Sequence, residues 1–474
     1  MKARTGLLIS AGSIIQQGSQ FLFGIIVARA LGPADYGWFS IGRNALIWAA
    51  TLAPLGLDVA MIRYASQHGA TAQFWSVLSR LRVIVALISV ATMVAIVGFS
   101  GIALGSGAAL VMAASLAALP FVADSALLGG YYRGMRRPAL FSVIFDYGQS
   151  ALRLMVGGGL VVFGATVVVF ALANSAIAAL GALSVAVVAF SVRPNAGQPG
   201  SSINARSILT VGPWLAISLV SYGLLRILDL MVLGAHVSSD ELGRYAAIAA
   251  VSVFVQVYPM TLSQALGPEI AELSMRSDAR SAGLAIREFV GRASVAGAFV
   301  YGGIAIFGTH LDLIFGDKFH FDSWTLLLMS TAWLLSGVLN PTGYALSMTG
   351  RHRSESMLLV GGAALFAFLL FALVPTLGAR GAAGALLLAM LFIQGGRVVL
   401  VSRLIDSAVV RARDLLPPVL ALGIAKSIDL VVEHYLGQSF ATLVGECVTY
   451  TAAYGLSVLG FRYFRRRLQP DLAR

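Results

Sequence analysis

Two long apolar stretches constrain this chain more than any other feature of its sequence. Residues 83–123 and 154–192 contain no Asp, Glu, Lys or Arg. Each stretch has twice the roughly 20 residues with which a helix crosses a bilayer, so each must turn once and form two spans. We expect these turns at Ser100–Gly107 and near Gly164, where small and flexible residues gather.

Composition extends this conclusion to the whole chain and excludes the soluble classes of protein. The 474 residues are 58% apolar and only 11% charged, whereas a soluble domain has about 25% charged residues. A disordered chain needs the opposite bias. Lys2 and Arg4 precede a helical pattern that is too long for a cleavable signal and reads as a first span. The sequence therefore predicts an all-α polytopic membrane protein.

The same length rule predicts about fourteen transmembrane helices, or twelve if one charge-free pair is re-entrant. The expected spans are residues 6–30, 37–62, 82–100, 106–131, 140–162, 167–191, 207–234, 244–268, 290–309, 323–348, 356–375, 381–402, 415–434 and 440–461.

The net charge of +12 is explained by membrane topology without nucleic acid as a partner. Most of the 33 Lys and Arg residues lie in alternate connections and at both ends of the chain. Basic residues gather on the cytoplasmic side of membrane proteins, where they meet anionic lipid headgroups. We therefore expect both termini in the cytoplasm. The single cysteine, Cys447, forms no intramolecular disulfide and is expected to be a small buried residue.

The two halves of the chain resemble each other. Leu31-Gly32 matches Leu233-Gly234, and residues 35–39 match residues 241–245 after a four-residue insertion. Transporters use parallel repeats of this kind to enclose a central substrate cavity between two bundles. The expected parts are an N-terminal six-helix lobe (1–192), a Pro-, Gly- and Ser-rich cytoplasmic linker (193–206), a C-terminal six-helix lobe (207–406) and an extra helix pair with a basic cytoplasmic tail (407–474).

Seven ionisable residues lie at predicted membrane depth, where a charge is costly and usually faces a cavity or a partner. They are Arg43, Asp58, Asp124, Asp146, Arg153, Arg226 and Asp229. Weaker polar signals, among them Gln16, Gln20 and Asn174, either line a hydrophilic lumen or bridge helices.

The three arginines are the candidate substrate-binding cations. Arg153 lies near mid-span with no acid within one helical turn, and its planar guanidinium suits a phosphate group. Arg226 either lines a cavity or pairs with Asp229, which follows it at i+3. Arg43 lies one to two turns inside the outer end of its span, where snorkelling towards the interface is the alternative.

The four acids Asp58, Asp124, Asp146 and Asp229 are the candidates for ion coupling or gating. Asp58 follows Pro54 and Gly56, and Asp124 follows Pro120. Proline frees a backbone carbonyl and kinks a helix, so each site is either functional or a packing kink. No pair of histidines has metal-ligand spacing, and the sequence has no phosphate-binding loop. We therefore expect that the protein binds no cofactor or metal and is not an enzyme.

The ends of the first two predicted spans carry a family motif. Residues 28–44 read ARALGPADYGWFSIGRN, and residues 55–66 read LGLDVAMIRYAS. The pattern resembles the polysaccharide-exporting, Wzx-type oligosaccharide flippases of the multidrug/oligosaccharidyl-lipid/polysaccharide (MOP) exporter superfamily. The motif positions are occupied by Arg29, Gly32, Tyr36, Gly37 and Arg63.

The resemblance implies export of an undecaprenyl-diphosphate-linked oligosaccharide across the bacterial inner membrane, for surface polysaccharides such as lipopolysaccharide or exopolysaccharide. It implies two six-helix lobes around a cationic cavity, which fits Arg153 and Arg226. It also implies alternating access driven by H⁺ or Na⁺, with a polymerase or chain-length regulators as partners.

Three alternative functions remain open. The extra helices at 415–461 resemble the lipid groove of peptidoglycan-precursor (lipid II) flippases. A drug/cation antiporter of the same superfamily is disfavoured by the three arginines among the seven charges at predicted membrane depth. A membrane-embedded polysaccharide polymerase is disfavoured by the short loops.

Overall fold

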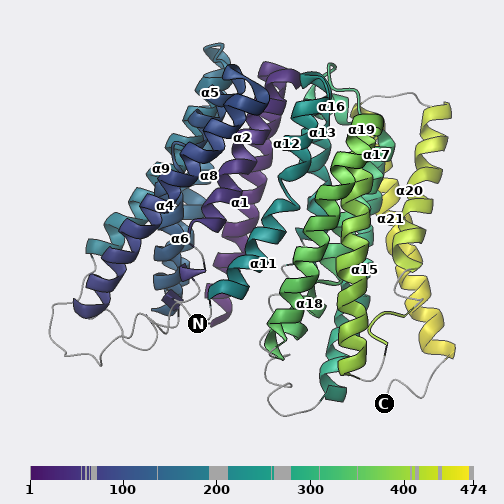
Figure 1. Cartoon of the computed structure of the whole chain (residues 1–474). Helices are drawn as coiled ribbons and strands as arrows, with labels where there is room; N and C mark the ends of the chain where they lie inside the picture. The colour runs from purple at the N-terminus through teal and green to yellow at the C-terminus, as the bar shows by residue number, and fades with distance from the viewer. Residues whose placement is uncertain are drawn as a thin grey trace. The chain divides into compact units, whose positions relative to one another are not determined.

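The structure of the chain is a computed structural model, and all of its regular secondary structure in the described residues is helical (Figure 1). It describes residues 2–54, 56–58, 61, 62, 65, 72–135, 137–191, 212–257, 259–260, 279–308, 310–349, 351–405, 408–411, 416–435 and 440–468. The chain divides into two compact units, Met1–Ala246 and Ala247–Arg474. The predicted linker, residues 193–206, lies outside the described residues, so the predicted lobe boundaries stay a prediction.

The first unit holds the helices from α1 to α12 and the beginning of α13. Their bounds are α1 (Lys2–Leu31), α2 (Pro33–Leu52), α4 (Ala72–Leu104), α5 (Ser106–Leu116), α6 (Leu119–Gly134), α7 (Pro138–Ser142), the π-helix η1 (Val143–Tyr147), α8 (Gly148–Val162), α9 (Val167–Ser191), α11 (Gly212–Leu224), α12 (Leu228–His236) and α13 (Ser239–Ser252).

Both turns predicted in the charge-free stretches are confirmed. Gly105 separates α4 from α5 with a φ of 91°, and Gly164 separates α8 from α9 with a φ of 60°. Glycine adopts this left-handed conformation without the steric cost that a Cβ atom brings. Each apolar stretch therefore folds back on itself at a glycine.

The second predicted span, residues 37–62, is wrong as a single helix. α2 begins earlier, at Pro33, whose fixed φ suits the first helical turn. It ends at Leu52, and the chain then turns through Pro54 to Gly56, whose φ is 77°. The expected kink is thus a complete break. Only Ala117 and Ala118, both in right-handed helical conformation, separate α5 from α6, which carries a proline in its first turn.

Two other predicted spans are also interrupted. The span 207–234 is divided at residues 225–227 into α11 and α12. The span 323–348 is divided at Leu339 into α17 (Ser323–Val338) and α18 (Asn340–Met348). Neither interruption follows from the length rule, which counts residues and does not locate breaks within a span.

The second unit holds the remaining helices. Besides α17 and α18, it contains α15 (Ala279–Phe307), α16 (Leu311–Phe315), α19 (His352–Leu404), α20 (Leu416–Tyr435) and α21 (Phe440–Leu468). The predicted spans 356–375 and 381–402 both lie in α19. They meet at Gly378, whose φ of 53° and ψ of −130° are not helical. α19 is therefore two helices joined at a kink.

α20 and α21 run side by side, drawn in yellow in Figure 1, and both contact α15. Small residues such as Ala298, Ala421 and Ala425 are buried where these helices meet. Lipid tails are as apolar as the helices, so the hydrophobic effect does not drive helices together in a membrane. Close packing does, and small side chains let the helix backbones approach closely. The C-terminal pair is thus packed onto the second unit.

Six helical segments of the described residues are long and apolar enough to cross a membrane. They are Phe74–Leu104, Ser106–Gly134, Val167–Phe190, Ile217–His236, Gly283–Ile306 and His352–Leu404. α4 also exposes a series of large apolar side chains, including Leu87, Val94 and Phe99. Exposed apolar surface of this extent fits contact with lipid.

Candidate functional site

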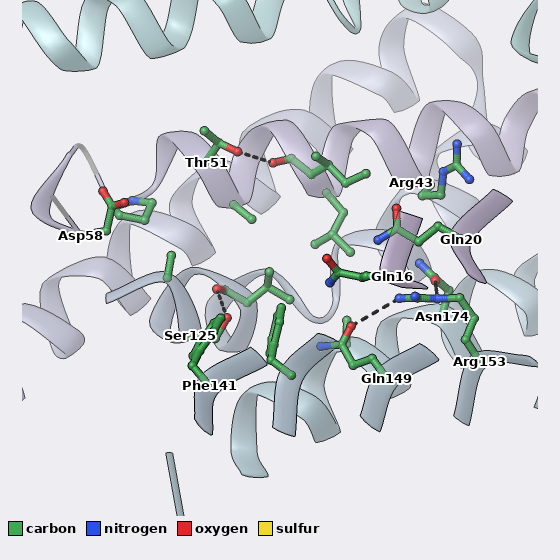
Figure 2. A pocket seen from close by; sticks show the side chains of 18 of the residues that line it. Gln16, Gln20, Arg43, Thr51, Asp58, Ser125, Phe141, Gln149, Arg153 and Asn174 are labelled. Carbon is green, nitrogen blue, oxygen red and sulfur yellow. Dashed lines mark hydrogen bonds between the residues drawn. The ribbon is translucent and has the colours of Figure 1, made fainter. Parts of the chain in front are cut away.

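A cavity of about 450 Å³ lies inside the first unit. Its walls come from α1, α2, the break after α2, α6, the segment from α7 to α8, α9 and α11. Most of the lining is apolar. Figure 2 shows the polar side chains Gln16, Gln20, Arg43, Gln149, Arg153 and Asn174 gathered at one end, and Asp58 at the other. A volume of this size is in the range of ligand pockets.

Arg153 is the central cation of the polar end. It projects from α8 and is 4% exposed. Its guanidinium donates to three neutral oxygens: Oδ1 of Asn174 (3.4 Å), Oε1 of Gln149 (3.4 Å) and Oγ of Ser19 (3.5 Å). These distances are longer than those of ordinary hydrogen bonds. The positive charge is therefore only weakly compensated by the protein.

Arg43 is the second cation of this end and comes from α2. Its Nε atom is buried and has no hydrogen-bond partner within the described part of the chain. The guanidinium groups of Arg43 and Arg153 interact repulsively. Two like charges in a partly apolar cavity are stabilised by an anion placed between them or beside them. The polar end thus concentrates two positive charges in a mostly apolar cavity.

Asp58 follows the break after α2 and lines the opposite end of the cavity. Its carboxylate lies 3.7 Å from the guanidinium of Arg133 on α6. The backbone carbonyl of Asp58 also approaches α6 closely, since a Cβ on Gly130 would lie 2.2 Å from it. The break at Pro54 therefore places the Asp58 carboxylate at the cavity wall, away from Arg43 and Arg153.

The other predicted acids lie outside the lining of this cavity. Asp124 on α6 is held by two hydrogen bonds from Arg82 on α4, of 2.6 and 2.7 Å. The same guanidinium lies 4.7 Å from the ring centre of Phe190. Asp146, in the π-helix, accepts a hydrogen bond of 2.5 Å from Ser142. Both carboxylates thus have structural partners.

Arg226 and Asp229 lie at the break between α11 and α12. Asp229 is buried at 4% exposure and accepts a hydrogen bond of 2.7 Å from the hydroxyl of Tyr245. It also accepts one from the backbone N–H of Leu230. Arg226 lies in the break between α11 and α12, with an exposed side chain. Neither residue lines the cavity described above.

The family-motif residues shape the backbone. Gly32 precedes α2 with a φ of 81°, and Tyr36 is fully buried. A Cβ on Gly37 would lie 2.9 Å from the backbone nitrogen of Gly243, and one on Gly243 would lie 1.7 Å from the carbonyl oxygen of Pro33. Gly37 and Gly243 thus permit a close backbone contact. Arg29 is exposed at the end of α1, and Arg63 lies outside the described residues.

Sequence reasoning missed three polar residues of the cavity, Thr51, Ser125 and Gln149, of which Gln149 lies at the end with the cations. Gln149 is buried at 3% exposure and lies one helical turn before Arg153. This i, i+4 spacing places both side chains on one face, which is the signal that identifies it. Gln16, Gln20 and Asn174, weak signals in the sequence, do line the cavity.

Comparison with known families agrees with the resemblance that the motif indicates. Residues 3–274 match the family model described as "Polysaccharide biosynthesis protein". The chain belongs to this family. A search of curated proteins gives no match.

Solved structures show the fold. The lipid II flippase MurJ, in an inward closed conformation, is similar with a TM-score of 0.78 at 10% identity, over 99% of this chain and 100% of that one. An inward-facing multidrug resistance MATE family transporter of the MOP superfamily gives 0.58 at 15% identity, over 89% and 96%. A MOP superfamily transporter from Pyrococcus furiosus gives 0.54 at 15% identity, over 91% and 96%. The protein is therefore a multi-pass membrane protein with a MOP transporter fold, as the motif indicates.

Proposed function

We propose that this protein flips an undecaprenyl-diphosphate-linked oligosaccharide from the cytoplasmic to the periplasmic leaflet of the bacterial inner membrane. Transport proceeds by alternating access, is driven by an H⁺ or Na⁺ gradient and involves no catalysis. The fourteen predicted spans, both cytoplasmic termini and the two six-helix lobes belong to this proposal. The polysaccharide biosynthesis family and the MOP fold support it.

One observation carries the proposal: Arg153 is buried in the cavity beside Arg43 and is held by neutral oxygens at 3.4 to 3.5 Å. Such a site favours an anionic ligand over a cationic drug. A diphosphate or an acidic sugar supplies the missing charge, with the bidentate geometry that arginine prefers.

The amide side chains around the cations favour a sugar-bearing ligand. Gln16, Gln20, Gln149 and Asn174 each present both a donor and an acceptor to the cavity or its cations. Sugar hydroxyl groups also donate and accept hydrogen bonds, so the amide side chains can form hydrogen bonds with them in either direction. Neighbouring apolar side chains, such as Phe23 and Phe145, offer surface for the non-polar faces of the rings.

Arg153→Ala tests this role. Hydrogen bonds to charged groups contribute about 1.5–3 kcal/mol, so we expect transport of lipid-linked repeat units to fall roughly tenfold or more. Arg153→Lys is expected to recover only part of it, because lysine lacks the planar fork. The measurement is the leaflet distribution of lipid-linked repeat units in cells that contain equal amounts of each variant.

Arg292→Ala is the matched control, since Arg292 is exposed and pairs with Glu288 on the surface of α15. It should leave the leaflet distribution unchanged. Normal transport by Arg153→Ala would refute the role of the cavity cation.

A lipid II flippase is the second candidate, favoured by the fold similarity to MurJ over the entire chain. Deletion of the gene separates the two. Accumulation of lipid-linked polysaccharide repeats on the inner leaflet supports our proposal, whereas accumulation of inner-leaflet lipid II supports the second candidate. Unpolymerised repeats on the outer leaflet would instead support a polymerase.

A further inference from the structure

The cavity of the first unit is elongated along α2. Its lining residues on this helix, from Arg43 to Thr51, recur at i, i+3, i+4, i+7 and i+8, so they share one face. Thr51 is eight residues beyond Arg43, which corresponds to about 12 Å along the helix axis. Pro54 and Asp58 continue the lining beyond the end of α2. A ligand that fills the cavity therefore contacts both ends at once.

The end near Arg43 and Arg153 is rich in hydrogen-bond donors. Besides the two guanidinium groups it holds Gln149, which is 3% exposed and accepts from Arg153 through Oε1. Among the described residues, Nε2 of Gln149 and Nε of Arg43 have no hydrogen-bond partner. Buried donors are costly unless a ligand or a water molecule accepts from them. A phosphate group, which offers several acceptor oxygens and a negative charge, fits this end.

The opposite end of the cavity presents hydrogen-bond acceptors. Figure 2 shows Thr51, Ser125 and Asp58 on the side away from the two arginines. The hydroxyl of Thr51 donates to the backbone carbonyl of Ile47 at 2.8 Å, and that of Ser125 donates to Val122 at 2.7 Å. A hydroxyl has a single hydrogen, so in this arrangement both side chains offer only lone pairs to a ligand. This end is therefore suited to a ligand group that donates.

Asp58 supplies a negative charge at this end and is held loosely by the protein. Its side chain is 25% exposed, and its carboxylate lies 3.7 Å from Nη2 of Arg133, which exceeds the length of a hydrogen bond. Arg133 is 49% exposed and donates through Nε to the carbonyl of Gly129 in its own helix. The carboxylate of Asp58 can therefore accept a hydrogen bond from a ligand.

The wall between the two ends is apolar. Leu46 and Ala50 line it from α2, and Phe145 lines it from the π-helix η1. Such surface contacts the non-polar face of a sugar ring, while the few polar groups of a pocket fix the orientation of its ligand. Here a negative group is attracted by the two arginines and repelled by Asp58. A ligand with a phosphate at one end is thus held with its other end at Asp58.

We propose that the cavity selects its saccharide by this polarity: the phosphate binds at Arg43 and Arg153, and a sugar further along the ligand donates a hydrogen bond to Asp58. An amino sugar is preferred at that position, a neutral sugar binds less tightly, and an acidic sugar is disfavoured. A phosphate with one sugar ring is shorter than the cavity, so the selected sugar is not the one joined to the phosphate. This inference rests on the proposed function and narrows its substrate class.

Three soluble probes that differ in their terminal sugar test this selectivity. Cellobiose 1-phosphate ends in glucose, and its two analogues end in glucosamine, which carries an ammonium group, and in glucuronic acid, which carries a carboxylate. Isothermal titration calorimetry measures the binding of each probe to the purified full-length protein in detergent. We expect the Kd of the wild type to rise in the order amino, neutral, acidic, by about fivefold or more at each step, because charge-assisted hydrogen bonds are the stronger ones.

Three variants assign the selectivity to its residue. Asp58→Asn should bind the three probes with Kd values within about twofold of one another, because a neutral amide both donates and accepts. Arg153→Ala should weaken the binding of all three by about tenfold or more, since each probe carries the phosphate. Asp240→Asn is the matched control: the same substitution at an exposed acid outside the cavity lining should keep the wild-type order.

The outcomes separate this inference from the proposed function. Equal wild-type affinities for the three probes, or tightest binding of the acidic probe, overturn the inference alone, as does a wild-type order that persists in Asp58→Asn. If no probe binds, or if Arg153→Ala binds all three as the wild type does, the role of the cavity cations is refuted and the inference falls with it. The wild-type order decides the matter even if Asp58→Asn fails to fold.

Discussion

Two buried arginines of this protein have opposite surroundings. Arg153 is held by neutral oxygens at long distances, whereas Arg397 on α19 forms a two-bond ion pair with Glu355 and contacts Gln394. Both are less than 9% exposed. The guanidinium of Arg397 also packs against Gly343, next to the position where a Cβ atom on that residue would lie. Arg397 is thus a structural residue, and Arg153 has charge available for a ligand.

Replacing these two arginines by alanine should therefore have different effects on the stability of the fold. Arg397→Ala leaves the Glu355 carboxylate buried without its cation, which costs about 3–5 kcal/mol, so the midpoint of thermal unfolding should fall strongly. Arg153→Ala removes a poorly compensated charge and should not lower the midpoint. Thermal unfolding of both variants in the same detergent measures this, and a larger loss for Arg153→Ala would contradict our assignment.

Asp322, at the start of α17, gives a prediction about pH. Its carboxylate caps the helix by accepting from the backbone N–H of Thr325, and it accepts two hydrogen bonds from Arg380. These bonds lower the pKa of Asp322 to about 2. Because the pKa is depressed on folding, this stabilisation is present above about pH 4 and is lost as the pH falls towards 2.

Asp322→Ala should therefore be less stable than the wild type at neutral pH, by about 1 kcal/mol for the lost cap. The difference should shrink between about pH 4 and pH 2. Unfolding by denaturant across this range measures it. A difference that is independent of pH would show that the charge of Asp322 adds nothing to stability.

The sequence reveals which residues are charged but not which of them find partners. Arg153 stands out because its own helix carries no acid nearby. Asp124 looks equally isolated, yet Arg82 reaches it from 42 residues away. Asp229 has Arg226 as a candidate partner in its own predicted span, yet it accepts a hydrogen bond from Tyr245, 16 residues away. The periodicity of apolar residues describes one helix at a time, so it does not predict contacts between helices.

At the scale of helices, glycines decide both turns and close contacts. The turns at Gly105 and Gly164 could be predicted, since a charge-free stretch of that length has to fold back. The π-helix η1 could not, because its sequence, VIFDY, carries no distinguishing pattern. Its wider turn changes the side-chain register, and Asp146 does not line the cavity although it lies seven residues from Arg153.

The contact between Gly37 and Gly243 predicts a specific packing defect. Gly243→Ala places a Cβ 1.7 Å from the carbonyl oxygen of Pro33, so α2 and α13 must separate. We expect a loss of about 1–3 kcal/mol, as overpacking usually causes, seen as a lower midpoint of thermal unfolding.

Gly158→Ala is the matched helical control, because a Cβ there meets no atom within 4 Å. Alanine favours the helix over glycine, so this variant should unfold at the same temperature or higher. Equal destabilisation of both variants would show that the close contact is not the cause.

At the scale of the whole molecule, the arrangement of basic residues predicts the topology. The MOP transporter fold agrees with a multi-pass protein, and α9 and α20 lie within one residue of predicted spans, whereas α4 and α15 begin ten or more residues earlier than predicted. The proline at residue 54 indicates a kink, but the breaks at residues 225–227 and at Leu339 are not revealed by composition. The folding partners of such segments come from distant parts of the chain, so local sequence cannot predict them.

The predicted orientation can be measured with single cysteines in a Cys447→Ala background. Lys318 and Arg353 are both exposed and lie on opposite sides of the predicted membrane. Lys318→Cys should react with a membrane-impermeant maleimide in intact spheroplasts, and Arg353→Cys only after permeabilisation. The reverse pattern would refute cytoplasmic termini.

The contact of Gly37 with Gly243 has a consequence for the origin of the chain. The two glycines occupy equivalent positions of the predicted internal repeat, and in a two-fold symmetric dimer a residue on the axis meets its own copy. A half-length ancestor that paired through this single glycine would show the same contact. Joining two such copies in one gene would let each half diverge, so that a cationic cavity can form within one half.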